Sequence, residues 1–197
     1  MYTRTKELLL VPPAIEPVSV DEAARQCRVS GHDEDEYLAG LITTARKYLE
    51  DVCWSAFITQ TWQYWWDRYW WKMFIPRPPL QSVASIKYIP PTVQPQPDPA
   101  SYLTLDTSIW EVSSENQLPF VRLQYLRTWP ITRGYRDDVT MQVKVGYGDA
   151  PSDVPMPIRQ AIKLLVTHMF NVRGDEAPQE MPPAINHLIQ NYRFKEQ

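Results

Sequence analysis

The sequence predicts an α+β protein in which N- and C-terminal helices form a helical bundle and an antiparallel β unit is inserted between them. Apolar residues recur at helical spacing before about residue 55 and again after Asp153. Between these regions, apolar and polar residues alternate in short runs, as they do in strands. Because neither helical end has enough apolar surface for its own core, we expect residues 1–55 and 151–197 to form one helical core. Residues 56–150 would then be the inserted β-rich unit.

Size and composition are those of a globular protein with unusual proline and aromatic content. The 197 residues can bury a core as one large domain or two small ones. There are 19 prolines against 6 glycines, and aromatic residues make up 12%. The net charge of −3 provides no overall attraction for nucleic acid.

Cys27 and Cys53 lack metal-ligand spacing and are interpreted as buried thiols. No apolar run is long enough for a signal peptide or a membrane span, so we expect a soluble intracellular protein without membrane contact.

The N-terminal region is predicted to contain two helices. Ser19 and Glu22 fit a capping box, which would start a short helix that ends near Cys27 or Arg28. Asp33 and Glu36 form a second predicted capping pair. The acidic run that contains them is interpreted as a complement to the helix dipole rather than a metal site. The apolar stripe of the second helix consists of Tyr37, Leu38, Leu41, Ile42, Ala45, Tyr48, Leu49 and Val52.

The middle region is predicted to be a series of strands. The first strand carries Trp62, Tyr64 and Trp66 on one face, and the second spans Val83 to Ile89. The later strands are predicted near Tyr102–Leu105, Ile109–Val112, Phe120–Leu123 and Val139–Val145.

The C-terminal region returns to helical spacing. Asp153 can cap a helix whose first turn holds Pro155 and Pro157, and Gly174 is the predicted residue after its C-terminus. Pro182 and Pro183 would start a final short helix.

The tryptophan-dense segment is the main candidate for a functional surface. Five of the eight tryptophans lie between Trp62 and Trp71. Three interpretations remain open: packing in the sheet core, a protein–protein interface, or a platform that stacks sugars or bases. Few cations accompany these rings, which favours the protein interface. The residues predicted to contact a partner are Trp65, Trp66, Trp70 and Trp71, together with the C-terminal Tyr192, Arg193, Phe194 and Lys195.

Motifs for catalysis are absent from the sequence. His32, His168 and His187 are far apart, and there is no G-x-S-x-G elbow, H-E-x-x-H motif, P-loop or G-x-G-x-x-G loop. We therefore predict that the protein is not an enzyme and has no catalytic, cofactor-binding or metal-binding residues.

Four stretches in order resemble the head–tail connector, or adaptor, proteins of tailed bacteriophages and prophages, of the gene-transfer-agent type with a β insertion. They are LLLVPPAIEPVSVDEAARQCRV at Leu8–Val29, YLAGLITTARKYLEDVCWSAFITQTW at Tyr37–Trp62, IPRPPLQSVASIKYI at Ile75–Ile89 and VTMQVKVGYGDAPSDVPMPIRQAIKLLVTHMFNVR at Val139–Arg173. The resemblance covers most of the chain. It does not extend to Trp65–Trp71, Pro90–Pro99 or Ser108–Arg136.

This resemblance implies a structural virion protein located in the neck between head and tail and assembled in the host bacterial cytoplasm. Such adaptors form a homo-oligomeric ring, commonly of twelve copies, beneath the portal protein. The ring extends the DNA channel, lets DNA pass without sequence-specific binding, and docks the next neck, stopper or tail protein. The alternative function is an aromatic-rich module that binds carbohydrate or another polymer. It would require an exposed row formed by Trp62, Trp66 and Trp70.

Overall fold

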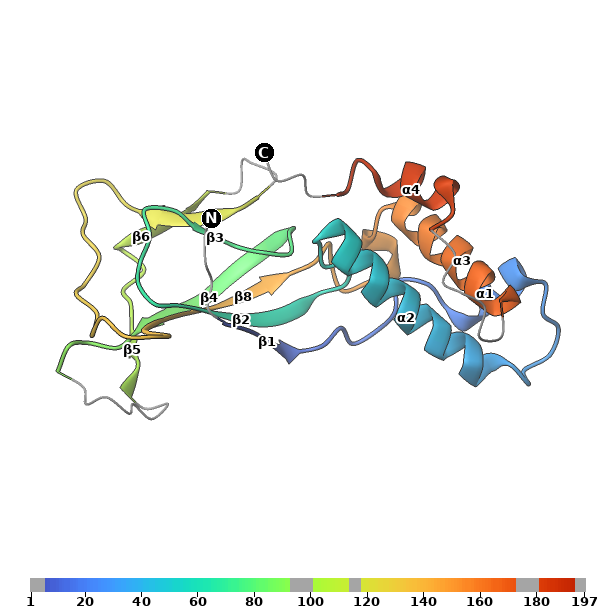
Figure 1. The fold of residues 1–197 in the computed structure, drawn as a ribbon, viewed down its shortest axis with the longest axis horizontal. Helices are drawn as coiled ribbons and strands as arrows, with labels where there is room; N and C mark the ends of the chain where they lie inside the picture. The colour runs from blue at the N-terminus through green and yellow to red at the C-terminus, as the bar shows by residue number, and fades with distance from the viewer. Residues whose placement is uncertain (1–5, 93–100, 114–117, 173–180, 194–197) are drawn as a thin grey trace. The chain divides into compact units, whose positions relative to one another are not determined.

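Residues 6–92, 101–113, 118–172 and 181–193 are described by the computed structural model, in which they form four α-helices and two antiparallel β-sheets (Figure 1). The predicted α+β class is therefore confirmed. The chain divides into two compact units. The β unit comprises Met1–Pro12 and Thr59–Gly146, and the helical unit comprises Pro13–Ile58 and Tyr147–Gln197.

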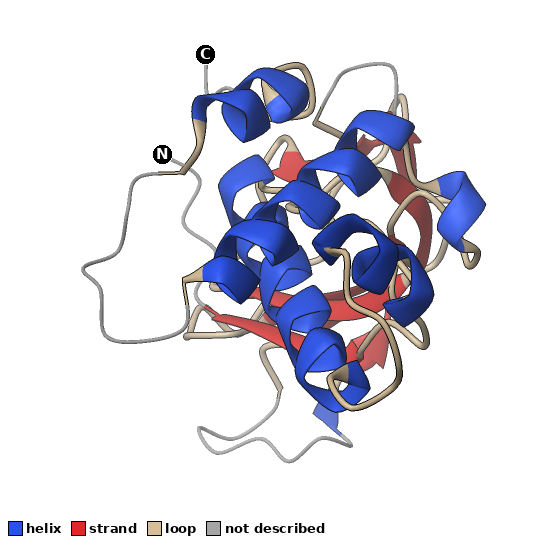
Figure 2. Cartoon of the chain, turned by 90° about the vertical axis from the view of Figure 1, so that its right-hand side faces the viewer, coloured by secondary structure: helices blue, strands red, loops and turns tan. Residues whose placement is uncertain are grey.

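The helices of the helical unit come from both sides of the β unit in the sequence. They are α1 (Val20–Cys27), α2 (Asp35–Cys53), α3 (Met156–Asn171) and α4 (Pro183–Ile189). In space α3 contacts each of the other three helices. Figure 2 shows the helices packed against one another. Their apolar stripes merge into one core, except that Tyr37 and Tyr48 of the predicted α2 stripe are exposed. These distant segments therefore stabilise each other. The principal core residues are Ala23, Leu38, Ile42, Leu49, Ile158, Ile162, Val166, Ile185 and Ile189.

The predicted capping box begins α1. The Glu22 N–H donates to Ser19 Oγ at 3.2 Å, and the Ser19 N–H donates to Glu22 Oε2 at 3.1 Å. The same carboxylate reaches α3, because Arg159 Nη2 donates to Glu22 Oε1 at 2.8 Å. Burial raises the pKa of Glu22, but the Ser19 N–H and the Arg159 guanidinium outweigh it and hold this pKa below its ordinary value.

Glu22→Gln is therefore expected to destabilise the helical unit in a pH-dependent way. A carboxyl group whose pKa is lower in the folded state stabilises that state at pH values above its pKa in the unfolded chain. This stabilisation is lost as the pH falls through the pKa of the group in the folded state. We expect a loss of about 1 kcal/mol at pH 7 that disappears in acid, below the lowered folded-state pKa of Glu22, measured by urea denaturation. Asp21→Asn removes a charge from the same turn without breaking the capping box and should cost less. An equal loss at pH 7 and in acid for Glu22→Gln would contradict this account.

Two other predicted caps are wrong. Helix α2 begins at Asp35 after Glu34, which makes no capping bond through its side chain, so Asp33 and Glu36 do not form a capping box. Asp153 does not cap α3. Its carboxylate instead accepts from the Ala150 N–H at 3.0 Å and closes the short 3-10 turn Pro151–Asp153. Helix α3 ends at Asn171, and the predicted end at Gly174 lies outside the described residues.

The larger sheet of the β unit has five strands in the order β1-β2-β8-β4-β5. They are β1 (Lys6–Val11), β2 (Gln60–Trp66), β8 (Val139–Val145), β4 (Leu80–Tyr88) and β5 (Leu103–Thr104). Strand β8 is central, and its pairing with β2 places Tyr64 opposite Met141 and Trp66 opposite Val139. These four side chains are buried and form part of the core of this unit.

The smaller sheet has three strands in the order β3-β7-β6. They are β3 (Met73–Phe74), β7 (Phe120–Leu123) and β6 (Trp110–Ser113). The sequence predicted β6 and β7 but neither the two-residue strand β3 nor a second sheet. A strand of two residues has no measurable alternation, and only its pairing with β7 defines it.

The N-terminal segment corrects the predicted helical region of residues 1–55. Lys6–Val11 forms a strand that pairs antiparallel with β2 and lies at the edge of the larger sheet. Its apolar run, Leu8–Val11, does not alternate and is exposed. The strand is therefore specified by its partner β2, about fifty residues further along the chain, and not by a pattern of its own.

Candidate partner interface

The tryptophan-dense segment supplies both core and surface. Trp66 is 3% exposed and Tyr64 is fully buried, so both belong to the core of the β unit. Trp71 follows β2 in the connection to β3 and is 67% exposed. Trp65 and Trp70 lie between these extremes. The prediction that Trp66 contacts a partner is thus corrected, because its ring has almost no accessible surface, whereas contact through the other three rings stays a prediction.

Each of the remaining rings carries a cation on its face. Lys6 Nζ lies 4.7 Å from the Trp65 ring centroid, and Lys72 Nζ lies 4.4 Å from that of Trp71. The Arg68 guanidinium lies 4.8 Å from the Trp70 centroid. Cation–π contacts of this kind orient large rings at a surface without burying them. The segment therefore presents aromatic surface together with positive charge, so a scarcity of cations no longer distinguishes a protein partner from nucleic acid, and the protein contact stays a prediction.

The connection between β7 and β8, residues 124–138 (the β7–β8 loop), carries exposed apolar side chains that no sequence motif indicated. Tyr125 is 89% exposed, Leu126 85% and Ile131 78%. Such exposure of large apolar side chains within one loop is typical of a binding surface. The loop has neither helical nor strand periodicity, so the signal available in the sequence was its composition. From Leu123 to Arg136 there are several apolar residues and arginines and no acidic residue.

This loop is held in place at its base. The Trp129 ring stacks on Tyr69 with centroids 4.5 Å apart and planes 1° from parallel. Asp138 is fully buried, forms an ion pair with Arg133 at 2.9 Å, and accepts from the Tyr135 N–H at 2.8 Å. The exposed apolar side chains are consequently displayed on an ordered scaffold, which lowers the entropy cost of binding.

The predicted C-terminal contact residues belong to the helical unit. Tyr192 packs against its core, and Arg193 Nη2 donates to Asn186 Oδ1 at 2.8 Å. Both are partly buried, and Phe194 and Lys195 lie outside the described residues. The predicted interface residues are thus divided between two units: the tryptophans lie in the β unit and the C-terminal residues in the helical unit.

Among the described residues, no group of three or more His, Cys, Asp and Glu side chains could hold a metal ion. Burial raises the pKa of the Cys53 thiol to about 11, which suppresses formation of the nucleophilic thiolate.

Within the described part of the chain, no helix has the length and apolar character needed to cross a bilayer.

Comparison with known proteins gives structural matches over nearly the whole chain. No protein-family model matches it, and no curated protein sequence does. A chain of the structure described as "Neck of empty GTA particle computed with C6 symmetry" matches with a TM-score of 0.77 and 18% identity, covering 98% of this chain and 97% of that one. A chain of "Virion of native gene transfer agent (GTA) particle" matches with a TM-score of 0.79 and 19% identity, with the same coverage.

A third chain, from "Neck of native GTA particle computed with C12 symmetry", has a TM-score of 0.72 and 18% identity, covering 96% of this chain and 97% of that one. At these identities the likeness shows the fold. The protein therefore has the mixed α+β fold found in these gene transfer agent chains.

Proposed function

We propose that this protein is a structural component of a virion neck, namely a head–tail connector that forms a homo-oligomeric ring beneath the portal protein. The observation that carries the proposal is the fold similarity, which extends over 98% of the chain to a protein of a gene transfer agent neck. Necks solved with C6 and C12 symmetry are consistent with a ring, and twelve copies is the number that the family resemblance implies. In this role the protein is not an enzyme and is located between head and tail.

The distribution of binding features supports a connector with several contacts. Trp71 and the β7–β8 loop expose large side chains, and Trp65 and Trp70 are partly exposed. These surfaces suit neighbouring copies, the portal and the next neck, stopper or tail protein. A net charge of −3 is consistent with a channel that DNA crosses without being held through its phosphates.

The alternative of a carbohydrate- or polymer-binding module receives less support. A stacking platform would need Trp62, Trp66 and Trp70 exposed in one row, and Trp66 is buried. Trp62 is itself covered on one face by the Arg77 guanidinium, 4.7 Å from its centroid.

The proposed function is tested by assembly with a portal protein. The purified chain, alone and mixed with portal rings, is examined by sedimentation velocity and negative-stain electron microscopy. We expect ring-shaped particles and co-sedimentation with the portal. A chain that stays monomeric and does not bind the portal under any tested salt concentration would contradict a connector role.

Removal of the C-terminal residues tests the predicted portal contact. Deletion of residues 192–197 is expected to abolish co-sedimentation with portal rings. Because Tyr192 and Arg193 also pack within the helical unit, a shorter deletion of residues 194–197 serves as the matched variant. The shorter variant should keep its fold by circular dichroism and still lose portal binding if Phe194 and Lys195 make the contact. Unchanged binding by both truncated chains would reject this docking role.

A further inference from the structure

Charge is divided unequally between the two units. Residues 1–12 and 59–146 hold 11 Lys and Arg against 8 Asp and Glu, a net charge of +3, whereas residues 13–58 and 147–197 hold 9 against 15, a net charge of −6. The modest net charge of −3 is therefore the sum of the charges of a basic β unit and an acidic helical unit. Opposite charge on two separate units favours attraction between unlike units of different copies.

The β7–β8 loop places a small net positive charge beside apolar surface, with three arginines against Asp137 and Asp138, and Arg127 lies near enough to Asp106 to interact with it. Arg133 is paired with Asp138 at the base of the loop, but Arg127 and Arg136 are exposed. Tyr125 and Leu126 directly precede Arg127, and both are exposed. The loop thus combines apolar side chains, which supply binding energy, with cations that select an acidic partner.

The outer face of α2 has the complementary character. Glu36, Tyr37, Tyr48 and Asp51 lie within about 120° of one another at 100° per residue, and all four are exposed. Trp54, which follows the helix, is exposed as well. Lys47 provides one cation on this face, and the rest of the acidic run at the start of α2 lies off it, with Asp35 bonded to His32 at 2.8 Å. This face therefore pairs aromatic rings with a net negative charge.

We infer that the β7–β8 loop of one copy docks on the outer face of α2 in the next copy of this chain. The inference rests on the proposed ring and specifies the contact that closes it. A ring requires a head-to-tail contact, in which two different patches of the same chain meet. A contact between like patches would place Arg127 and Arg136 of two copies together, and like charges oppose such pairing. Loop and helix face supply the two unlike patches, with aromatic groups in both.

Charge reversal tests this contact. The loop variant carries Arg127→Glu and Arg136→Glu, and the helix variant carries Glu36→Lys and Asp51→Lys. Each alone is expected to weaken self-association at least about tenfold in sedimentation velocity, with or without portal rings, because like charges then face each other. An equimolar mixture should restore assembly. When the two variants alternate in the ring, the acidic loop of the loop variant meets the basic helix face of the helix variant. The unmodified basic loop of the helix variant then meets the unmodified acidic helix face of the loop variant.

The matched control is Lys87→Glu with Lys144→Glu, which changes the net charge as much as the loop variant at two exposed positions of β4 and β8. It should assemble as the unmodified chain does. Restoration by mixing shows that both variants are folded and that the two patches meet.

The inference is overturned if the loop variant assembles normally, or if the mixture of two folded variants stays dissociated. It is likewise overturned if the loop variant assembles normally but loses affinity for duplex DNA in a mobility-shift assay, since the loop would then face nucleic acid. In all these outcomes the unmodified chain still forms rings and the proposed function stands, whereas a failure of the unmodified chain to assemble would reject both.

Discussion

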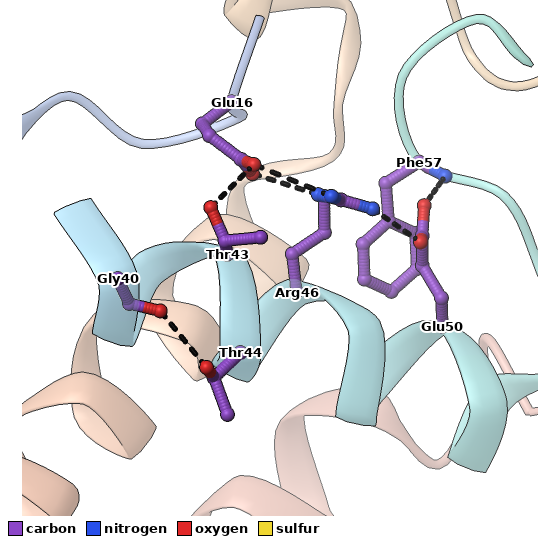
Figure 3. Close-up of polar contacts among 7 residues, drawn as sticks. All are labelled: Glu16, Gly40, Thr43, Thr44, Arg46, Glu50 and Phe57. Carbon is purple, nitrogen blue, oxygen red and sulfur yellow. Dashed lines mark hydrogen bonds and ion pairs between the residues drawn. The ribbon is translucent and has the colours of Figure 1, made fainter. Parts of the chain in front are cut away.

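Replacing Arg46 by alanine is expected to lower the free energy of unfolding of the helical unit by about 3–5 kcal/mol. Arg46 is 4% exposed on α2, and its guanidinium donates to two carboxylates. Its Nε lies 2.7 Å from Glu16 Oε2, and its Nη1 lies 2.7 Å from Glu50 Oε2 (Figure 3). Removal of the guanidinium would leave the buried Glu50 carboxylate without the positive charge that it now faces at 2.7 Å.

The other contacts of the two carboxylates explain why the loss should spread beyond α2. Glu50 Oε1 accepts from the Phe57 N–H at 2.9 Å, and Glu16 Oε1 accepts from Thr43 Oγ1 at 2.9 Å (Figure 3). Arg46 therefore joins the segment before α1, the middle of α2 and the chain that leaves α2. Burial alone would lower the pKa of Arg46, but hydrogen bonds and charge from Glu16 and Glu50 raise it, so the guanidinium stays protonated.

Urea denaturation of Arg46→Ala, followed by far-ultraviolet circular dichroism, measures this loss. Thr44→Ala is the matched control on the same helix. Its hydroxyl donates to the Gly40 carbonyl at 2.9 Å and is exposed (Figure 3). We expect the control to change the free energy of unfolding by less than about 0.5 kcal/mol. A loss below about 1 kcal/mol for Arg46→Ala would mean that water replaces the guanidinium at little cost. In that case the ion pairs of Arg46 with Glu16 and Glu50 would not hold the segment before α1 and the chain after α2 to the helix.

The sequence predicted those elements whose own residues carry a periodic pattern. Strands β7 and β8 and the capping box of α1 were found because alternation or cap spacing lies within a few residues. Strand β1 was missed, since its hydrogen bonds go to β2 and its apolar run does not alternate. The Arg46–Glu50 pair was missed for a related reason. At a separation of four residues it is indistinguishable in sequence from an exposed helical ion pair, and only tertiary packing buries it.

The candidate interface was predictable only as a region. Tryptophan content indicated that residues 62–71 are a candidate functional surface. It could not distinguish a ring that faces the core of the sheet from one in the turn that follows the strand. The β7–β8 loop lacked any periodic signal, so its exposed apolar side chains became apparent only when the fold placed Trp129 on Tyr69 and left Tyr125 and Leu126 outside.

Trp66→Ala and Trp71→Ala are expected to have opposite consequences, which makes them a test of the division between core and surface. Trp66 lies on β2, is 3% exposed, and its ring centroid is 6.1 Å from that of Tyr64. Its removal leaves a cavity beside the central strand, and we expect a loss of about 3–5 kcal/mol in the free energy of unfolding of the β unit. The measurement is urea denaturation followed by the near-ultraviolet signal of the remaining aromatic residues.

Trp71→Ala should change the stability of the isolated chain by no more than about 1 kcal/mol, because its ring is 67% exposed and its contact with Lys72 is a surface cation–π pair. Combined with Trp70→Ala, it should instead weaken assembly with portal rings while the circular dichroism spectrum stays unchanged. Normal assembly of the double variant would remove these two rings from the interface and leave the β7–β8 loop as the binding surface of the β unit. A large loss of stability in Trp71→Ala would show that this ring supports the fold despite its exposure, since an exposed side chain can affect unfolding strongly only through contacts that its removal breaks.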